Sequence, residues 1–66
     1  MEIEFNGKKL KVKDGITLAE FINSAKLDPE KIIVEYNANI IGRETWDSVI
    51  LKSSDVLVVL SFVGGG

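Results

Sequence analysis

The first thirteen residues alternate between apolar and charged side chains, as the two strands of a β-hairpin do. Asn6-Gly7 stands between the alternating segments, and this dipeptide is typical of a type I′ turn, which needs positive φ at both central positions. The turn fixes the register, so we expect Ile3 opposite Leu10 and an apolar face on their side of the hairpin. The other face then carries two opposite-charge pairs, Glu2 with Lys11 and Glu4 with Lys9.

A helix is predicted to follow this hairpin. Thr17 and Glu20 have the spacing of a capping box, so the helix should begin at Thr17. The residue before a proline avoids the α region, so the helix should end before Asp28-Pro29. Its apolar residues have the i, i+3, i+4, i+7 spacing of a single stripe, which we expect to pack on the apolar face of the hairpin: Leu18, Phe21, Ile22 and Ala25.

The second half of the chain predicts three more strands. They cover Ile32–Tyr36, residues 40–41 and residues 56–63. Residues 42–51 are less regular and should form a loop with helical turns around Trp46 and Val49. A hairpin, one helix and further strands indicate an α+β fold, a single two-layer domain over residues 1–66.

The last predicted strand is apolar on both faces, although one helix can cover only one face of a sheet. Leu57 and Val59 point to one side, and Val58, Leu60 and Phe62 point to the other. A buried central strand gives the same pattern, whereas an exposed apolar patch marks a partner site. We therefore expect the face with Val58, Leu60 and Phe62 to be a docking surface, with a core strand as the alternative.

The composition removes several classes of function. The 66 residues include no Cys and no His, which excludes disulfides, thiolate nucleophiles, imidazole catalysis and most zinc sites. A net charge of −2 argues against nucleic-acid and anionic-membrane partners. The longest apolar run is too short to span a bilayer, and the start lacks the pattern of a secretion signal, so we expect a cytoplasmic protein. No carboxylates converge, so we expect no metal site and no catalytic centre, and Trp46 should pack in the core.

The sequence ends in Gly64, Gly65 and Gly66. Glycine contributes nothing to a core, so these residues are either a frayed end or a flexible tail with a function. A tail without Cβ atoms fits a narrow channel and presents its α-carboxylate to another protein. That carboxylate is ionised at neutral pH and is a poor electrophile. It therefore needs activation by a partner, for example as an acyl-adenylate.

The chain as a whole resembles the ThiS family of sulfur carrier proteins, which are small ubiquitin-like β-grasp proteins of thiamin biosynthesis. The departures are Gly42, where the family often has Pro, and Ser53-Ser54-Asp55, where an Asp-Gly-Asp turn is common. The resemblance rests on five features in order: Asn6-Gly7 after the first strand, Asp14-Gly15-Ile16-Thr17 before the helix, Tyr36-Asn37, Arg43 with Trp46, and Val63-Gly64-Gly65-Gly66.

The resemblance implies a ubiquitin-like β-grasp fold, a mixed sheet of order 2-1-5-3-4 packed on one helix, with the first and last strands parallel. It implies that an E1-like, ThiF-type adenylyltransferase uses ATP to adenylate the carboxylate of Gly66. Sulfur from a donor such as a cysteine desulfurase then displaces AMP and leaves a thiocarboxylate, which goes to a ThiG-type thiazole synthase. The chain would be a carrier that is monomeric when free, not an enzyme, and would bind no cofactor itself.

Three alternatives remain open from the sequence. The same carrier chemistry could serve molybdopterin synthesis or tRNA thiolation, although molybdopterin carriers tend to be longer. A ubiquitin-like modifier would instead be joined to lysines of other proteins and would give conjugates of high mass. A β-grasp interaction module with an inert tail would keep its function when the tail is deleted.

Overall fold

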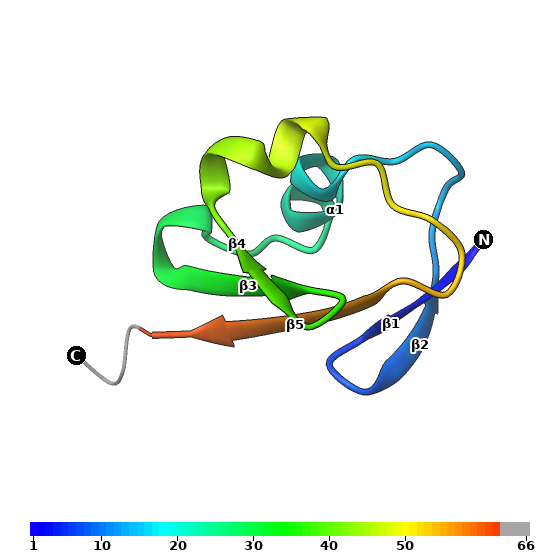
Figure 1. Ribbon diagram of the computed structural model, residues 1–66, viewed down its shortest axis with the longest axis horizontal. Coiled ribbons are helices and arrows are strands. Elements are labelled where there is room, and N and C mark those ends of the chain that lie inside the picture. The colour runs from blue at the N-terminus through cyan, green and yellow to red at the C-terminus, as the bar shows by residue number, and fades with distance from the viewer. Residues whose placement is uncertain (63–66) are drawn as a thin grey trace.

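The computed structural model describes residues 1–62 of the chain. In this part, five strands form one mixed sheet in the order β2-β1-β5-β3-β4, and the helices lie together on one side of it (Figure 1). The sheet order and the parallel pairing of β1 with β5 confirm the predicted β-grasp topology. The elements are β1 (Glu2–Phe5), β2 (Lys8–Lys11), α1 (Leu18–Ser24), the 3-10 helix η1 (Pro29–Lys31), β3 (Ile32–Tyr36), β4 (Asn39–Ile41), the 3-10 helix η2 (Arg43–Ser48) and β5 (Val56–Ser61).

The β1–β2 hairpin has the register that its turn predicts. Ile3 lies opposite Leu10, and the charged pairs Glu2/Lys11 and Glu4/Lys9 lie on the other face. Asn6 and Gly7 have φ values of 49° and 84°, as a type I′ turn requires. The sequence pattern of this segment was therefore sufficient to predict its pairing.

The start of α1 confirms the predicted capping box. Thr17 Oγ1 accepts a hydrogen bond from the Glu20 backbone N–H at 3.1 Å, and Glu20 Oε1 accepts one from the Thr17 N–H at 2.9 Å. The Thr17 N–H bond lowers the pKa of the Glu20 carboxyl. Both groups thereby satisfy backbone donors that the first helical turn leaves free.

The end of α1 differs from the prediction, since the helix stops at Ser24 rather than at the proline. Lys26 adopts φ 60°, and its N–H donates to the Asn23 carbonyl at 3.1 Å, while the Leu27 N–H donates to the Ile22 carbonyl at 3.3 Å. These two bonds form a Schellman motif, which ends the helix before the proline acts.

The predicted apolar stripe of α1 is therefore one residue shorter. Ala25 is the C-cap and is exposed, so it does not belong to the buried stripe. Leu18, Phe21 and Ile22 are buried against the sheet, and the ring of Phe21 meets that of Phe5 edge to face, with centroids 5.2 Å apart. The remaining core comes from the strands, from η2 and from the loops before α1 and after η2: Ile3, Ile16, Ile32, Val34, Trp46, Leu51, Leu57 and Val59.

The second half of the chain follows the predicted order with shifted boundaries. β3 has the predicted bounds, while β4 begins one residue earlier, at Asn39. β5 ends at Ser61, and residue 63 of the predicted strand lies outside the described residues. The structure adds η1, which the sequence did not predict. It also corrects the second predicted helical turn, because Val49 is only the C-cap of η2.

None of the helices within residues 1–62 is long and apolar enough to cross a membrane.

Candidate functional site

β5 lies in the centre of the sheet and has two different faces. Leu57 and Val59 are buried beneath the helices. Val58 is half-buried on the opposite face, where 53% of Leu60 and 58% of Phe62 remain exposed. The structure thus brings together the three residues predicted as a docking surface, and the helices leave their face of the sheet uncovered.

Residues of β3 and β4 widen this apolar area. Ile33 lies opposite Leu60, and Ile40 reaches the same face because it pairs with Glu35, which itself lies opposite Val58. Ile33 and Ile40 are both exposed, and Glu35 is half-buried between the apolar positions. Sequence reasoning missed both isoleucines, although the alternation of Ile33 with the buried Ile32 and Val34 could have revealed one of them. We call Ile33, Ile40, Val58, Leu60 and Phe62 the open apolar face.

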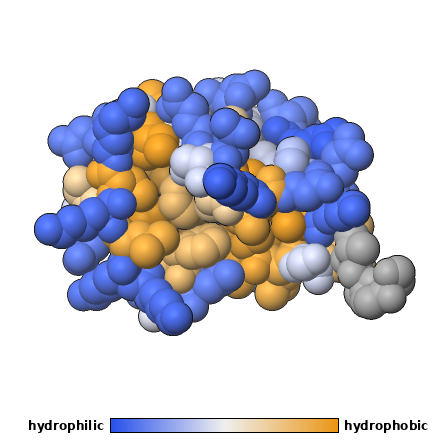
Figure 2. All heavy atoms as spheres, turned by 180° about the vertical axis from the view of Figure 1, so that it is seen from behind, coloured by the Kyte–Doolittle hydropathy of each residue, from blue (hydrophilic) through white to orange (hydrophobic). Residues whose placement is uncertain are grey.

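The space-filling view (Figure 2) also shows exposed apolar side chains gathered in one area. Figure 2, which views the molecule from behind Figure 1, shows apolar side chains gathered across the surface within a border of hydrophilic ones. Large exposed apolar patches that are bordered by polar residues are typical of interaction sites. An interaction surface is therefore the kind of site that this small domain offers.

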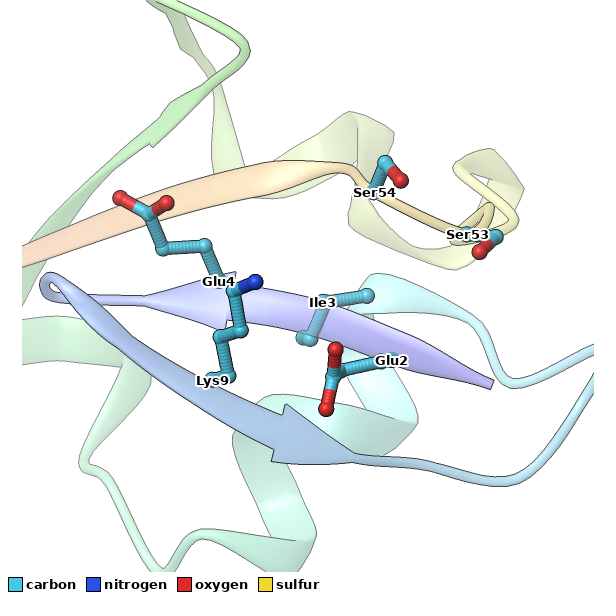
Figure 3. Close-up of a pocket in the computed structure, with 6 residues that line it drawn as sticks. All are labelled: Glu2, Ile3, Glu4, Lys9, Ser53 and Ser54. Atoms are coloured by element: carbon cyan, nitrogen blue, oxygen red, sulfur yellow. The ribbon is translucent and has the colours of Figure 1, made fainter.

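The charged end of the sheet offers less. A shallow hollow of about 270 Å³ lies between β1 and the loop before β5, with Glu2, Glu4, Lys9 and two serines around it (Figure 3). β1 and this loop lie at the end of the sheet away from the tip of β5 (Figure 1). Within residues 1–62, no ion pair joins Lys9 to either glutamate within 4.0 Å. We interpret these groups as a solvated sheet face rather than a binding site.

Trp46 and Arg43 have structural surroundings. Trp46 is buried in the core, as predicted. Arg43 makes an exposed ion pair with Glu30, with Nη1 and Oε2 3.8 Å apart, and exposed pairs of this kind contribute at most about 1 kcal/mol. Neither side chain lies on the open apolar face. In the described part of the chain, no three acidic residues come together in a way that could hold a metal ion.

The start of β5 is fixed by a buried polar network around Asp55. Its carboxylate accepts hydrogen bonds from the Tyr36 hydroxyl at 2.7 Å, the Lys52 backbone N–H at 2.7 Å and the Asn37 side-chain amide at 3.1 Å. Burial favours the neutral acid, but these hydrogen bonds together outweigh it and lower the pKa of Asp55. Burial and the neighbouring Asp55 carboxylate raise the pKa of Tyr36 to about 12.

This network is a structural anchor that the sequence did not reveal. Its members are 3 to 19 positions apart from Asp55 in the chain, and only the fold brings them together. Asn37 also pairs with Val56. Its side-chain Oδ1 accepts a hydrogen bond from the Val56 N–H at 2.8 Å, and its backbone N–H donates to the Val56 carbonyl at 2.8 Å. The first residue of β5 is thereby held on the β3 side.

The end of β5 is held by a second asparagine, on the β1 side. Asn6 Oδ1 accepts a hydrogen bond from the Val59 N–H at 2.8 Å, and its Nδ2 donates to the Val59 carbonyl at 3.3 Å. β5 ends two residues later, at Ser61, and Phe62 is the last residue that the structure describes. The predicted tail residues Gly64 and Gly65 and the predicted reactive residue Gly66 lie outside the described residues.

Comparison with known proteins finds relatives both in sequence and in structure. The model of the ThiS family matches residues 1–66. The chain is 40% identical to the sulfur carrier protein ThiS of Bacillus subtilis, over 97% of this chain and 98% of that protein. The crystal structure of a thiamine biosynthesis protein (ThiS) from Geobacter metallireducens has a TM-score of 0.87 at 30% identity and covers both chains completely.

A second kind of relative is much longer. The chain is 35% identical to a thiazole synthase of Magnetococcus marinus, which it matches over its whole length, but it spans only 20% of that protein. The chain is also 26% identical to a thiazole synthase of Paramagnetospirillum magneticum, again over its whole length and over 20% of that protein.

Proposed function

The chain belongs to the ThiS family of sulfur carrier proteins of thiamin biosynthesis, and from this membership we propose that the carboxylate of Gly66 carries the sulfur. The observation that supports the proposal most strongly is the match of the whole chain, including its three terminal glycines, to the family model. The absence of Cys from the sequence agrees with it, because no side chain of this protein can hold transferable sulfur as a thiol.

The chemistry at Gly66 has two steps. The carboxylate oxygen attacks the α-phosphorus of ATP, so that pyrophosphate leaves and an acyl-adenylate forms. Sulfur at the oxidation level of sulfide then attacks the carbonyl carbon, the bond from carbon to the AMP oxygen breaks, and a thiocarboxylate remains. Activation is required because an ionised carboxylate repels nucleophiles. The chain supplies only the carboxylate of Gly66 and the two glycines that lead to it, while the partner binds ATP.

The adenylating partner in this proposal is an E1-like, ThiF-type adenylyltransferase, and the sulfur donor is a cysteine desulfurase or an equivalent enzyme. A desulfurase holds the sulfur as a persulfide, so a thiol outside this chain must release it at the level of sulfide and form a disulfide in the process. The docking surface is the part of the open apolar face nearest the terminus: Val58, Leu60 and Phe62. Leu60 and Phe62 are more than half exposed, so a partner can cover them without disturbing the core. Gly64 and Gly65 then cross from this surface into the partner's active site, since a chain without Cβ atoms fits a narrow channel.

The recipient in this proposal is a ThiG-type thiazole synthase. Two relatives that bear the name thiazole synthase contain a region similar to the whole of this chain, which supports such a recipient over molybdopterin synthesis or tRNA thiolation. The protein itself acts as a carrier and not as an enzyme, because it is consumed in one transfer and regenerated by its partners. It acts in the cytoplasm, where ATP is available.

Intact-mass measurement tests the proposed reactive residue. The chain is incubated with the adenylyltransferase, ATP and a sulfur donor, and a parallel sample lacks ATP. We expect the complete sample alone to gain the mass difference of one sulfur for one oxygen, located on the C-terminal peptide. A chain without Gly66, or with one residue added after it, should stay folded and gain nothing, because an oriented attack tolerates little displacement.

Two outcomes would contradict the proposal. A deletion variant that gains the same mass on its new terminus at a similar rate would remove the assignment to Gly66. Conjugates of high mass with lysines of other proteins, in place of the thiocarboxylate, would identify a ubiquitin-like modifier instead.

A further inference from the structure

We propose that Asn6 is a positioning residue for sulfur loading, because its side chain fixes the end of β5 that leads to the C-terminal glycines. This inference rests on the proposed function of Gly66. It assigns a role to a residue of the first hairpin, which is 60 positions from Gly66 in the sequence and lies outside the open apolar face.

The backbone ladder between β1 and β5 is short. Its pairs are Glu4 with Val56 and Phe5 with Leu57, and the N–H groups of Glu4 and Asn6 donate to the carbonyls of Asp55 and Leu57 at 2.9 Å each. β1 then leaves the sheet edge at the Asn6-Gly7 turn. The backbone of β1 therefore cannot reach the next residue of β5 on this side, which is Val59.

The side chain of Asn6 takes the place of that missing ladder step. It accepts from the Val59 N–H at 2.8 Å and donates to the Val59 carbonyl at 3.3 Å, as a backbone peptide group would. A turn residue can do this only if it tolerates the left-handed conformation and carries both an acceptor and a donor. Asn6 has φ 49° and an amide, so it meets both requirements.

This contact is the last one that holds β5 from the β1 side within the described residues. Beyond it, β5 is paired with β3 alone, through Ile32 opposite Ser61 and through the Phe62 N–H, which donates to the Lys31 carbonyl at 3.1 Å. Without the Asn6 amide, the hydrogen bonds that hold β5 from the β1 side would end at Leu57. The segment held from the β3 side alone would then begin after Leu57 instead of after Val59, so a longer one-edged segment would lead to the terminus.

Asn37 provides a matched comparison at the other end of the same strand. It also has φ 49°, and its side chain also accepts from a β5 N–H at 2.8 Å, that of Val56. Its place is the start of β5, where loosening the strand leaves the path from Val59 to the terminus unchanged. Removal of the Asn37 amide therefore tests general weakening of β5, whereas removal of the Asn6 amide tests positioning.

Three variants separate these effects. Asn6→Gly and Asn37→Gly both remove the amide and keep the left-handed conformation free of strain. Asn6→Asp keeps an oxygen that can accept from the Val59 N–H, but it replaces the donor with a charged oxygen that faces the Val59 carbonyl. Each variant is loaded with the adenylyltransferase, ATP and a sulfur donor at several carrier concentrations, and the exchange rate of the Val59 amide hydrogen is measured in the free protein.

We expect Asn6→Gly to lower kcat for loading by about tenfold or more, because small displacements of a reacting group cost large factors in rate. Asn6→Asp should recover only the part of this loss that comes from the Val59 N–H contact, because its second oxygen repels the Val59 carbonyl. Asn37→Gly should stay within about twofold of the wild-type rate although its fold is weakened. Exchange of the Val59 amide should accelerate in Asn6→Gly by more than that of other core amides, and in Asn37→Gly by no more than theirs.

Wild-type loading by Asn6→Gly would overturn the inference, as would an equal loss of kcat in Asn37→Gly. If the wild-type chain itself gains no sulfur, the proposed function fails. The exchange rates then still decide whether Asn6 fixes this end of the strand, and unchanged Val59 exchange in Asn6→Gly would overturn that part too.

Discussion

The two ends of β5 are held in place by different means. At its start, the buried Asp55 carboxylate accepts three hydrogen bonds, and Leu57 is completely buried two residues later. At its end, a single asparagine side chain holds Val59 from the β1 side, and Leu60 and Phe62 beyond it are more than half exposed. One strand thus combines an end that contributes stability with an end that is open to a partner.

This difference shows how a domain of 66 residues can keep a fold and a docking surface together. A small domain buries a smaller fraction of its surface on folding than a large one. Apolar residues left in solvent therefore reduce its free energy of unfolding by a larger fraction. The structure places that cost on the face of the sheet that no helix covers, where Leu60 and Phe62 follow the buried part of β5 and Ile33 and Ile40 lie on the neighbouring strands. We therefore expect changes at the start of β5 to affect unfolding, and changes at its end to affect partners.

The largest effect on stability is expected at the start of the strand. Asp55→Ala would leave the Tyr36 hydroxyl and the Lys52 N–H without their buried acceptor. We expect the free energy of unfolding, measured by chemical denaturation, to fall by about 1.5–3 kcal/mol. Asp47→Ala, which removes an exposed aspartate, is the control and should change it by less than about 0.5 kcal/mol. Equal losses in both variants would contradict the proposed anchor.

The same network sets the pH dependence of unfolding. Because the pKa of Asp55 is lowered in the fold, its stabilising contribution is complete above the unfolded value of about 3.9 and is lost as the pH falls further. Because the pKa of Tyr36 is raised to about 12, the contribution of its neutral hydroxyl is complete below about pH 10 and is lost as the pH rises toward 12. Asp55→Ala should flatten the acid side of the profile.

The smaller effect on stability, and the larger effect on binding, is expected at the end of the strand. Phe62→Asp should change the free energy of unfolding by less than about 0.5 kcal/mol and should abolish binding to the adenylyltransferase, measured by titration calorimetry. Ile50→Asp is matched in exposure, 55% against 58% for Phe62, and lies in a loop bridged to Thr17 on the helix side of the sheet. It should leave both quantities unchanged.

A large loss of stability in Phe62→Asp would show that Phe62 belongs to the core. Loss of binding in Ile50→Asp would show that any exposed apolar residue contributes, and the two ends of β5 would no longer differ in function.

The parts of the molecule that the sequence predicted well are those set by local rules. The Asn6-Gly7 turn fixed the register of the first hairpin, and simple alternation separated Leu57 and Val59 from Leu60 and Phe62. The end of α1 was wrong because Lys26 adopts a left-handed conformation that usually belongs to glycine. The sequence pattern contained no glycine there to indicate it.

The contacts that hold β5 could not be predicted, because they join residues far apart in the chain. Asn6 and Val59 are 53 positions apart, and Tyr36 and Asp55 are 19 positions apart. Nothing in the local pattern distinguishes Asn6 as a turn residue from Asn6 as a partner of another strand. The tail residues Gly64, Gly65 and Gly66 were assigned from the sequence and from the family, and their role stays a prediction.

The most direct test of the account follows one sulfur atom. The chain is loaded with a heavy sulfur isotope, purified as the thiocarboxylate and mixed with thiazole synthase and its other substrates, and the thiazole product is analysed by mass spectrometry. We predict that the heavy isotope enters the thiazole ring and that the chain returns to its carboxylate mass. A thiazole without the heavy isotope, formed while the chain keeps its sulfur, would show that this chain is not the source of the thiazole sulfur.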